Sequence, residues 1–217
     1  MFDASGIQLI IFDFDGVIVE SNDIKDRVFK KIFSRFPEHA DDFWQFHKTY
    51  ISIPRVAKFE YVLEKMGRKD DTDFKQALLT EFSDLTLELM RSVSFVKGAK
   101  EFLKAINGKM PVYLASVTPI ADLDIIVTHL QIRSLFTDIY GCPPWNKPDA
   151  IRDILQRENQ SPDQTVLIGD SYGDQRAAKE TGIHFIGRNS GLGFEDPQPV
   201  TIIPDLTGLL QILKIAD

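Results

Sequence analysis

A short apolar run that ends in two aspartates, at residues 9–16, constrains the fold of this chain more than any other segment. Residues 9–12 are all apolar and do not alternate with polar residues, which is typical of a strand buried on both faces of a parallel sheet. Asp13 and Asp15 follow at its carboxyl end, where open α/β sheets place their functional groups. Two carboxylates this close repel each other, so the sequence predicts a nearby cation or a bound proton that reduces the repulsion.

Further short apolar runs alternate with segments of helical periodicity. Strands are expected at residues 112–115, 138–141, 165–169, 184–187 and 201–203. Helices are expected at residues 98–106 and 120–130, after Lys147, after Asp174 and at residues 206–215. Strands that alternate with helices form right-handed βαβ units and a parallel sheet. The predicted fold class is therefore α/β, with a doubly wound Rossmann-like parallel sheet.

Residues 21–92 follow a different pattern. Their apolar residues recur at the three- and four-residue spacing of amphipathic helices, without a convincing strand between them. Pro37, Pro54 and Gly67 divide the segment into separate helices. We therefore expect a core formed by residues 1–20 and 93–217, and an α-helical domain inserted at residues 21–92.

The composition disfavours several classes of function. The net charge is −7, so no basic excess exists to bind a nucleic-acid backbone. Cys142 is the single cysteine, which excludes an intramolecular disulfide and fits a reducing compartment. The first residues lack the basic and apolar regions of a signal peptide, and no apolar run has the length of a membrane span. We expect a cytoplasmic protein with no membrane partner, as a monomer or a weak homodimer.

Polar clusters at residues 13–16, 116–118 and 170–174 each come directly after an expected strand. In a parallel sheet these strand ends meet at one edge. Asp13 is a carboxylate able to act as a nucleophile, and Asp15 is able to give a proton to a leaving oxygen and then activate water. Asp170 and Asp174 add carboxylate oxygens, so the cluster is a suitable partial ligand set for Mg²⁺.

Two further groups suit a phosphorylated substrate. Ser116 and the backbone amides that follow it, beginning at Val117, can hold anionic oxygens at the start of a helix. Lys147 opens another expected helix and can neutralise both a carboxylate nucleophile and a phosphoryl oxygen. A metal, a lysine, a hydroxyl and amides around a carboxylate together predict a site for phosphoryl transfer.

The order of these motifs closely resembles the haloacid dehalogenase-like hydrolase superfamily over nearly the whole chain. The motifs are Asp-Phe-Asp-Gly-Val at residues 13–17, Ser116, Lys147, and Gly-Asp-Ser-x-x-Asp at residues 169–174. The resemblance implies that Asp13 is the aspartyl-phosphate nucleophile and a Mg²⁺ ligand. It implies that Asp15 is the general acid and base and binds the metal through its carbonyl. Ser116 and Lys147 would hold the phosphoryl group, Asp170 would bind Mg²⁺, and Asp174 would bind it through water or orient Lys147.

The insertion at residues 21–92 looks like the helical cap of the phosphatase branch, similar to phosphoglycolate phosphatases and β-phosphoglucomutases. Such a cap would close over the site on hinges near residues 18–21 and 92–97. Arg55 and Lys58 would share one face of a helix that starts near Pro54, as possible contacts to the substrate. Their alternative role is that of solvated helix charges. This stretch resembles the cap of phosphatase-like proteins from surface-polysaccharide gene clusters, which suggests an acidic or sugar phosphate as substrate.

These inferences predict a Mg²⁺-dependent phosphatase that hydrolyses a small phosphorylated metabolite through an aspartyl phosphate. The presence of Asp15 argues against dehalogenation, because a halide leaves without a proton. A phosphomutase of the same family is the nearest alternative. A non-enzymatic phospho-aspartate signalling domain is an alternative of another class, although such domains carry the phosphorylated aspartate on a later strand and lack a large helical insertion.

Overall fold

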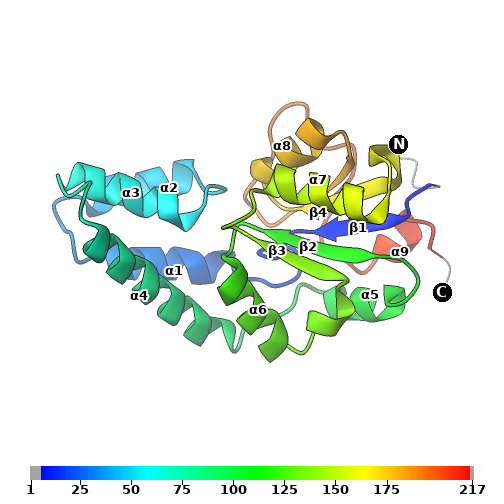
Figure 1. Ribbon diagram of the computed structural model, residues 1–217, viewed down its shortest axis with the longest axis horizontal. Coiled ribbons are helices and arrows are strands. Elements are labelled where there is room, and N and C mark those ends of the chain that lie inside the picture. The colour runs from blue at the N-terminus through cyan, green and yellow to red at the C-terminus, as the bar shows by residue number, and fades with distance from the viewer. Residues whose placement is uncertain (1–5, 216–217) are drawn as a thin grey trace. The chain divides into compact units, whose positions relative to one another are not determined.

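The computed structural model describes residues 6–215, and its centre is a six-stranded sheet in which every pair of neighbours is parallel (Figure 1). The strand order is β3-β2-β1-β4-β5-β6. The strands are β1 (Leu9–Phe12), β2 (Val112–Ser116), β3 (Asp138–Gly141), β4 (Thr165–Gly169), β5 (His184–Arg188) and β6 (Ile202–Ile203). The predicted α/β fold class is confirmed.

Strand β1 lies in the middle of the sheet, between β2 and β4. All four of its residues are fully buried, as expected for an apolar run without alternation. Phe12 is in register with Leu114 on one side and with Ile168 on the other. This register brings the residues that follow β1, β2 and β4 to the same edge of the sheet.

Helices cover both faces of the sheet (Figure 1). Helices α7 and α8 lie on one face, where Ile151, Ile154 and Ala177 pack with Ile11 and Leu167 from the strands. On the other face Phe102 of α5 contacts Phe12 edge-on, with ring centroids 5.7 Å apart. The helices of this part are α5 (Ala99–Ile106), α6 (Ile120–His129), α7 (Lys147–Glu158), α8 (Tyr172–Thr181) and α9 (Leu209–Ile212), with short 3₁₀ turns η1 (Arg133–Leu135) and η2 (Pro162–Gln164).

The prediction of a helix over residues 206–215 was too long, since α9 covers Leu209–Ile212 only. The Asp205 carboxylate accepts hydrogen bonds from the Thr207 amide (2.9 Å) and hydroxyl (2.5 Å). This local side-chain turn competes with helix formation and delays the start of α9.

The chain divides into two compact units. One contains the sheet and is formed by the chain up to residue 20 and from residue 93 onward. The other, residues 21–92, is called the helical unit below. Its helices are α1 (Asn22–Phe33), α2 (Ala40–Thr49), α3 (Arg55–Lys65) and α4 (Thr72–Met90). Pro37 lies in the connection between α1 and α2, Pro54 is the N-cap of α3, and Gly67 follows the C-cap of α3.

Aromatic rings form the core of the helical unit, with Phe29 of α1 at its centre. The Phe29 ring lies 4.4 Å from the Phe82 ring and 5.8 Å from the Phe59 ring, measured between centroids. Its side chain is almost completely buried. Phe29 therefore connects α1 to both α3 and α4.

None of the helices between residues 6 and 215 is both long enough and apolar enough to cross a lipid bilayer. The cytoplasmic location and the oligomeric state stay predictions.

We expect Phe29→Ala to lower the free energy of unfolding of the helical unit by about 3–5 kcal/mol, because it removes a ring from a packed core and leaves a cavity. The chain has two tryptophans, Trp44 in the helical unit and Trp145 in the sheet unit. In a Trp145→Phe background, urea unfolding followed by Trp44 fluorescence reports on the helical unit alone.

Phe46→Ala is the matched control. The Phe46 ring stacks on Tyr61 with centroids 3.7 Å apart, but the side chain is only partly buried. We expect a loss of about 0.5–1.5 kcal/mol for this variant. Equal losses for the two variants would contradict a core centred on Phe29.

Candidate active site

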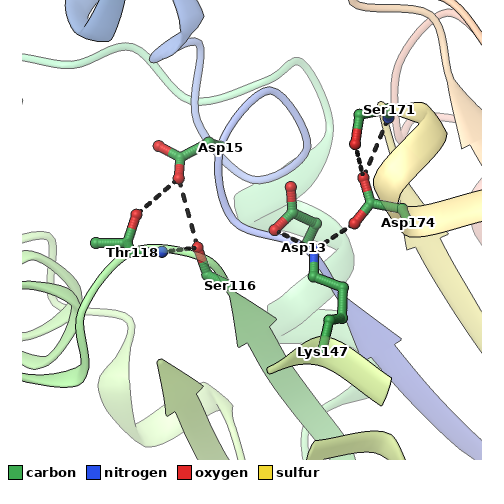
Figure 2. A network of polar contacts seen from close by, with 7 residues as sticks. All are labelled: Asp13, Asp15, Ser116, Thr118, Lys147, Ser171 and Asp174. Carbon is green, nitrogen blue, oxygen red and sulfur yellow. Dashed lines mark hydrogen bonds and ion pairs between the residues drawn. The ribbon is translucent and has the colours of Figure 1, made fainter. Parts of the chain in front are cut away.

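The candidate site lies where β1, β2 and β4 end (Figure 2). Asp13 is the first residue after β1, and its amide donates to the Ile168 carbonyl of β4 at 2.9 Å. Ser116 is the last residue of β2, and Asp170 follows β4 directly. The central position of β1 therefore holds Asp13 between groups that are more than 100 residues distant in the sequence.

The Lys147 ammonium group joins two of the predicted carboxylates. Its Nζ donates to Asp13 Oδ1 at 2.8 Å and also to Asp174 Oδ1. Lys147 is the first residue of α7, and the Asn146 side chain caps this helix by accepting from the Asp149 amide at 2.9 Å. The helix start thus fixes the backbone from which Lys147 reaches the end of β1.

Asp174 is held from a second side by Ser171. Its Oδ2 accepts from the Ser171 hydroxyl (2.6 Å) and amide (3.1 Å), which forms a capping box at the start of α8. A Cβ atom at Gly169 would lie 2.3 Å from the Asp174 Cβ, so only glycine leaves room for this carboxylate. Both oxygens of Asp174 are therefore engaged by protein donors.

Asp15 lies in a different environment from Asp13 (Figure 2). Its Oδ2 accepts from the Thr118 hydroxyl at 2.9 Å and from the Ser116 hydroxyl at 3.4 Å. The Ser116 oxygen also accepts from the Thr118 amide at 3.1 Å, so the segment around Val117 folds back on the end of β2. Thr118 belongs to the polar cluster at residues 116–118, but its contact with Asp15, 103 residues away, gave no local signal in the sequence.

A tight turn follows Asp15. Gly16 has a φ of +70°, a backbone conformation that favours glycine, and its amide donates to the Val19 carbonyl at 2.8 Å. The Ile18 amide donates to the Phe14 carbonyl at 2.9 Å. Because a trans peptide points its carbonyl opposite to its N–H, the Asp15 carbonyl is directed away from Val19. The turn therefore fixes the direction of the Asp15 carbonyl.

Negative charge exceeds positive charge in this site. Burial raises the pKa of Asp13 well above its ordinary value; Lys147 opposes that rise, and the carboxylates of Asp174, Asp170 and Asp15 add to it. Burial disfavours the charged form of Lys147, but Asp13 and Asp174 together raise its pKa above the ordinary value. Lys147 therefore stays protonated and relieves only part of the repulsion among the carboxylates.

The remaining charge and the type of donor atom fit a hard divalent cation. Asp13, Asp170 and Asp174 are buried, and each offers one oxygen atom within 4.8 Å of the others. Mg²⁺ prefers oxygen ligands and needs few from the protein, because it keeps several waters and takes phosphate oxygens. The residues present therefore suit this ion.

A comparison with known families decides the family of this chain. The family described as haloacid dehalogenase-like hydrolase matches residues 10–188 of the 217. The chain belongs to this family. The match confirms the resemblance that the four motifs indicate.

Curated relatives of this haloacid dehalogenase-like hydrolase are phosphatases. A phosphorylated carbohydrates phosphatase of Thermotoga maritima is 24% identical over 83% of this chain and 84% of its own. A phosphoglycolate phosphatase of Pseudomonas putida is 26% identical over 94% of this chain and 78% of its own.

Solved structures share the fold. A predicted phosphoglycolate phosphatase from Haemophilus somnus gives a TM-score of 0.76 at 20% identity, over 96% of this chain and 98% of its own. A β-phosphoglucomutase from Clostridium difficile gives 0.76 at 16% identity, over 96% of each chain. At these identities the likeness establishes the fold alone.

The predicted substrate contacts of the hydrolase, Arg55 and Lys58, both lie on α3 within the helical unit. Arg55 Nη2 donates to the Ser83 hydroxyl at 2.7 Å, and the guanidinium group lies over the Phe82 ring. Lys58 is 3% exposed, so its interpretation as a solvated charge is wrong. Its aliphatic stem and ammonium group are enclosed by the bundle, with Nζ 5.1 Å from the centre of the Phe29 ring.

Lys58 belongs to a buried polar chain. Its Nζ donates to His47 Nδ1 at 2.8 Å and to the Ile51 carbonyl at 3.1 Å. A protonated lysine has only donors, so beside the Lys58 ammonium group His47 accepts at Nδ1 and donates from Nε2 to Asp26 Oδ1, 2.8 Å away. Burial lowers the pKa of Lys58 to about 7, and burial also lowers the pKa of His47, against the opposing hydrogen bond to Asp26.

The buried Lys58 predicts a stability that increases with pH. As the pH rises from 7 to 9, the folded protein loses the remaining Lys58 proton, whereas the unfolded chain keeps its own. Unfolding then takes up a proton, so the free energy of unfolding rises by about 2 kcal/mol over this interval. Urea unfolding of the wild type and of Lys58→Met at the two pH values checks this. The free energy of unfolding of the variant should not show this rise between pH 7 and pH 9.

Lys69→Met is the control, since Lys69 is an exposed lysine of the same unit. We expect this variant to keep the wild-type difference in the free energy of unfolding between pH 7 and pH 9. The same pH dependence in wild type and Lys58→Met would contradict the deprotonation of Lys58 in the folded state.

Proposed function

We propose that this hydrolase is a phosphatase that hydrolyses a small phosphorylated metabolite through an aspartyl phosphate on Asp13. The observation that carries the proposal is the separation of two carboxylates into two roles. Asp13 contacts the Lys147 ammonium group, whereas Asp15 contacts the hydroxyls of Thr118 and Ser116. One carboxylate is thus paired as a nucleophile beside a cation, and the other is placed among neutral donors, as suits a group that carries a proton.

The two roles give a balanced reaction. An Asp13 oxygen forms a bond to phosphorus while the bond from phosphorus to the leaving alcohol oxygen breaks, and Asp15 gives that oxygen its proton. Asp15 then takes a proton from a water whose oxygen attacks the phosphorus. The Asp13 carboxylate leaves, and inorganic phosphate is released.

Lys147, Ser116 and the amide of Val117 are the proposed phosphate-binding groups. Lys147 is buried and stays protonated, so its charge is screened little by water and stabilises phosphoryl oxygens strongly. Ser116 ends β2 within hydrogen-bond distance of Asp15. The groups that bind the phosphate and the group that protonates the leaving oxygen therefore lie beside each other.

Asp13, Asp170 and the carbonyl of Asp15 are the proposed ligands of Mg²⁺. When bound, this ion would supply positive charge to the phosphoryl oxygens and lower the repulsion around Asp13. Asp174 already accepts from Ser171 at one oxygen and from Lys147 at the other. This supports the role of orienting Lys147 for Asp174, with any contact to the metal through water.

We propose that the helical unit is the cap that selects the substrate. Lys58 is occupied by His47 and Ile51, whereas Arg55 has a partly exposed side chain, so Arg55 is the better candidate of the two for contact with substrate. The names of the relatives, phosphoglycolate phosphatase and phosphorylated carbohydrates phosphatase, favour a phosphorylated acid or sugar.

Phosphate release from a panel of sugar phosphates and phosphorylated acids in the presence of Mg²⁺ tests the function. We expect turnover of at least one member, and a loss of at least 10³-fold in Asp13→Asn, because removal of a nucleophile leaves only binding and electrostatic effects. Asp149→Asn, which changes an aspartate in the first turn of α7, is expected to keep most of the activity. Equal rates for wild type and Asp13→Asn would refute the proposal.

Two other outcomes would identify the alternatives. A strict requirement for a sugar bisphosphate activator, with transfer to a sugar in place of phosphate release, would indicate a phosphomutase. A stable phosphoaspartate without turnover would indicate a signalling domain.

Removal of the metal gives an independent prediction. A chelator is expected to abolish turnover, and added Mg²⁺ is expected to restore it. Mg²⁺ should also raise the midpoint of thermal unfolding of the wild type, because an ion that binds only the folded state stabilises it. Asp170→Asn should lack this rise, and the same rise in that variant would exclude Asp170 as a ligand.

A further inference from the structure

Arg188 is a buried charged residue at the end of β5, outside the four motifs. Only 8% of it is exposed. Its Nη1 donates to the Gly16 carbonyl (3.1 Å) and to Glu20 Oε2 (3.0 Å), and its Nη2 donates to Glu20 Oε1 (2.5 Å). Its Nε donates to the Pro204 carbonyl at 3.2 Å. The guanidinium group thus binds two points of the segment that follows Asp15.

These two points are the two ends of one turn. Gly16 begins the turn next to Asp15, and Glu20 comes directly after its last residue, Val19. Asp15 forms a parallel bridge with Val19, and the Glu20 amide donates to the Ser94 carbonyl at 2.9 Å. The Arg188 side chain therefore links the two ends of the turn. Glu20 is held by hydrogen bonds at both its backbone amide and its carboxylate.

The chemistry of these contacts requires arginine. A buried cation is costly unless it is paired and hydrogen-bonded. The planar fork of arginine can bind a carboxylate with two parallel hydrogen bonds and still reach a carbonyl, whereas lysine presents a point charge. A residue that only filled space at the end of β5 would not need this charge.

We propose that Arg188 is a positioning residue that sets Asp15 for proton transfer by holding the turn at residues 16–19 closed. The side chain of Asp15 is oriented by Thr118, and its backbone is oriented by the turn that Arg188 clamps. A general acid acts only within hydrogen-bond reach of the oxygen that it protonates, so small displacements of its backbone reduce the rate. This inference rests on the proposed role of Asp15.

The leaving group distinguishes a positioning role from a merely structural one. An alkoxide leaves poorly without a proton, whereas p-nitrophenolate leaves readily. We expect Arg188→Gln to lower kcat for an alkyl phosphate by about 10-fold or more, and kcat for p-nitrophenyl phosphate by less than about 3-fold. Reduced folding alone would lower both rates by the same factor.

Arg133→Gln is the matched control. Arg133 also joins a carboxylate and a carbonyl, those of Asp138 and Phe136, but it lies in the short turn η1 that precedes β3. Arg133→Gln should lower kcat for both substrates by the same factor or leave both values unchanged. Arg188→Lys, which keeps the charge without the fork, is expected to be intermediate and also serves if Arg188→Gln does not fold.

Amide hydrogen exchange tests the clamp without any substrate. The Gly16 amide donates to the Val19 carbonyl, and the amides of Val17, Ile18 and Val19 donate to the Phe14 carbonyl. We expect their exchange to become at least about 10-fold faster in Arg188→Gln and to stay unchanged in Arg133→Gln. Unchanged exchange in Arg188→Gln, or equal losses on the two substrates, would overturn the inference. If the wild type hydrolyses neither substrate, the proposed function fails, and exchange alone decides whether Arg188 orders the turn.

Discussion

The site depends on two ion pairs that the buried ammonium group of Lys147 forms, one with Asp13 and one with Asp174. Each partner comes from a different element: Asp13 from the end of β1, Asp174 from the first turn of α8, and Lys147 from the first residue of α7. A buried ion pair is favourable only with good geometry and satisfied hydrogen bonds. The cap at Asn146, the capping box at Ser171 and the absence of a side chain at Gly169 supply that geometry.

The same interaction explains how two aspartates that are one residue apart acquire different properties. Lys147 donates to Asp13, whereas the Asp15 carboxylate accepts from the hydroxyls of Thr118 and Ser116. Unequal environments for two carboxylates are a recurring way to obtain two roles from one residue type. The sheet positions the pair, and different hydrogen-bond partners hold the two side chains.

The sequence predicted those features that depend on local pattern. The strands at residues 138–141 and 165–169 have the predicted bounds, because apolar runs between polar residues mark buried parallel strands clearly. The helix after residue 206 was overestimated, because the turn made by Asp205 competes with the apolar periodicity there.

Contacts between distant residues were harder to infer. Lys147 could be found because a known motif order contains it. Thr118 and Arg188 reach the segment at residues 15–20 from 103 and 168–172 positions away, and a single threonine or arginine carries no sign of its partner. The burial of Lys58 was missed for the same reason, since a helical lysine is normally solvated and only the packing of α1 and α2 around it shows otherwise.

The chain leaves and re-enters the sheet unit through neighbouring backbone positions. Val19 forms an antiparallel bridge with Phe95, and the Val96 amide donates to the Ile18 carbonyl at 3.0 Å. With respect to the sheet, residues 21–92 therefore form one long insertion whose two ends are hydrogen-bonded to each other where the chain leaves and re-enters the sheet unit. The entropic cost of closing a loop grows only with the logarithm of its length, so the stability of the sheet depends little on the size of the insertion. Such a junction allows the inserted unit, and with it the proposed selection of substrate, to be exchanged or enlarged while the carboxylates at the sheet edge stay as they are.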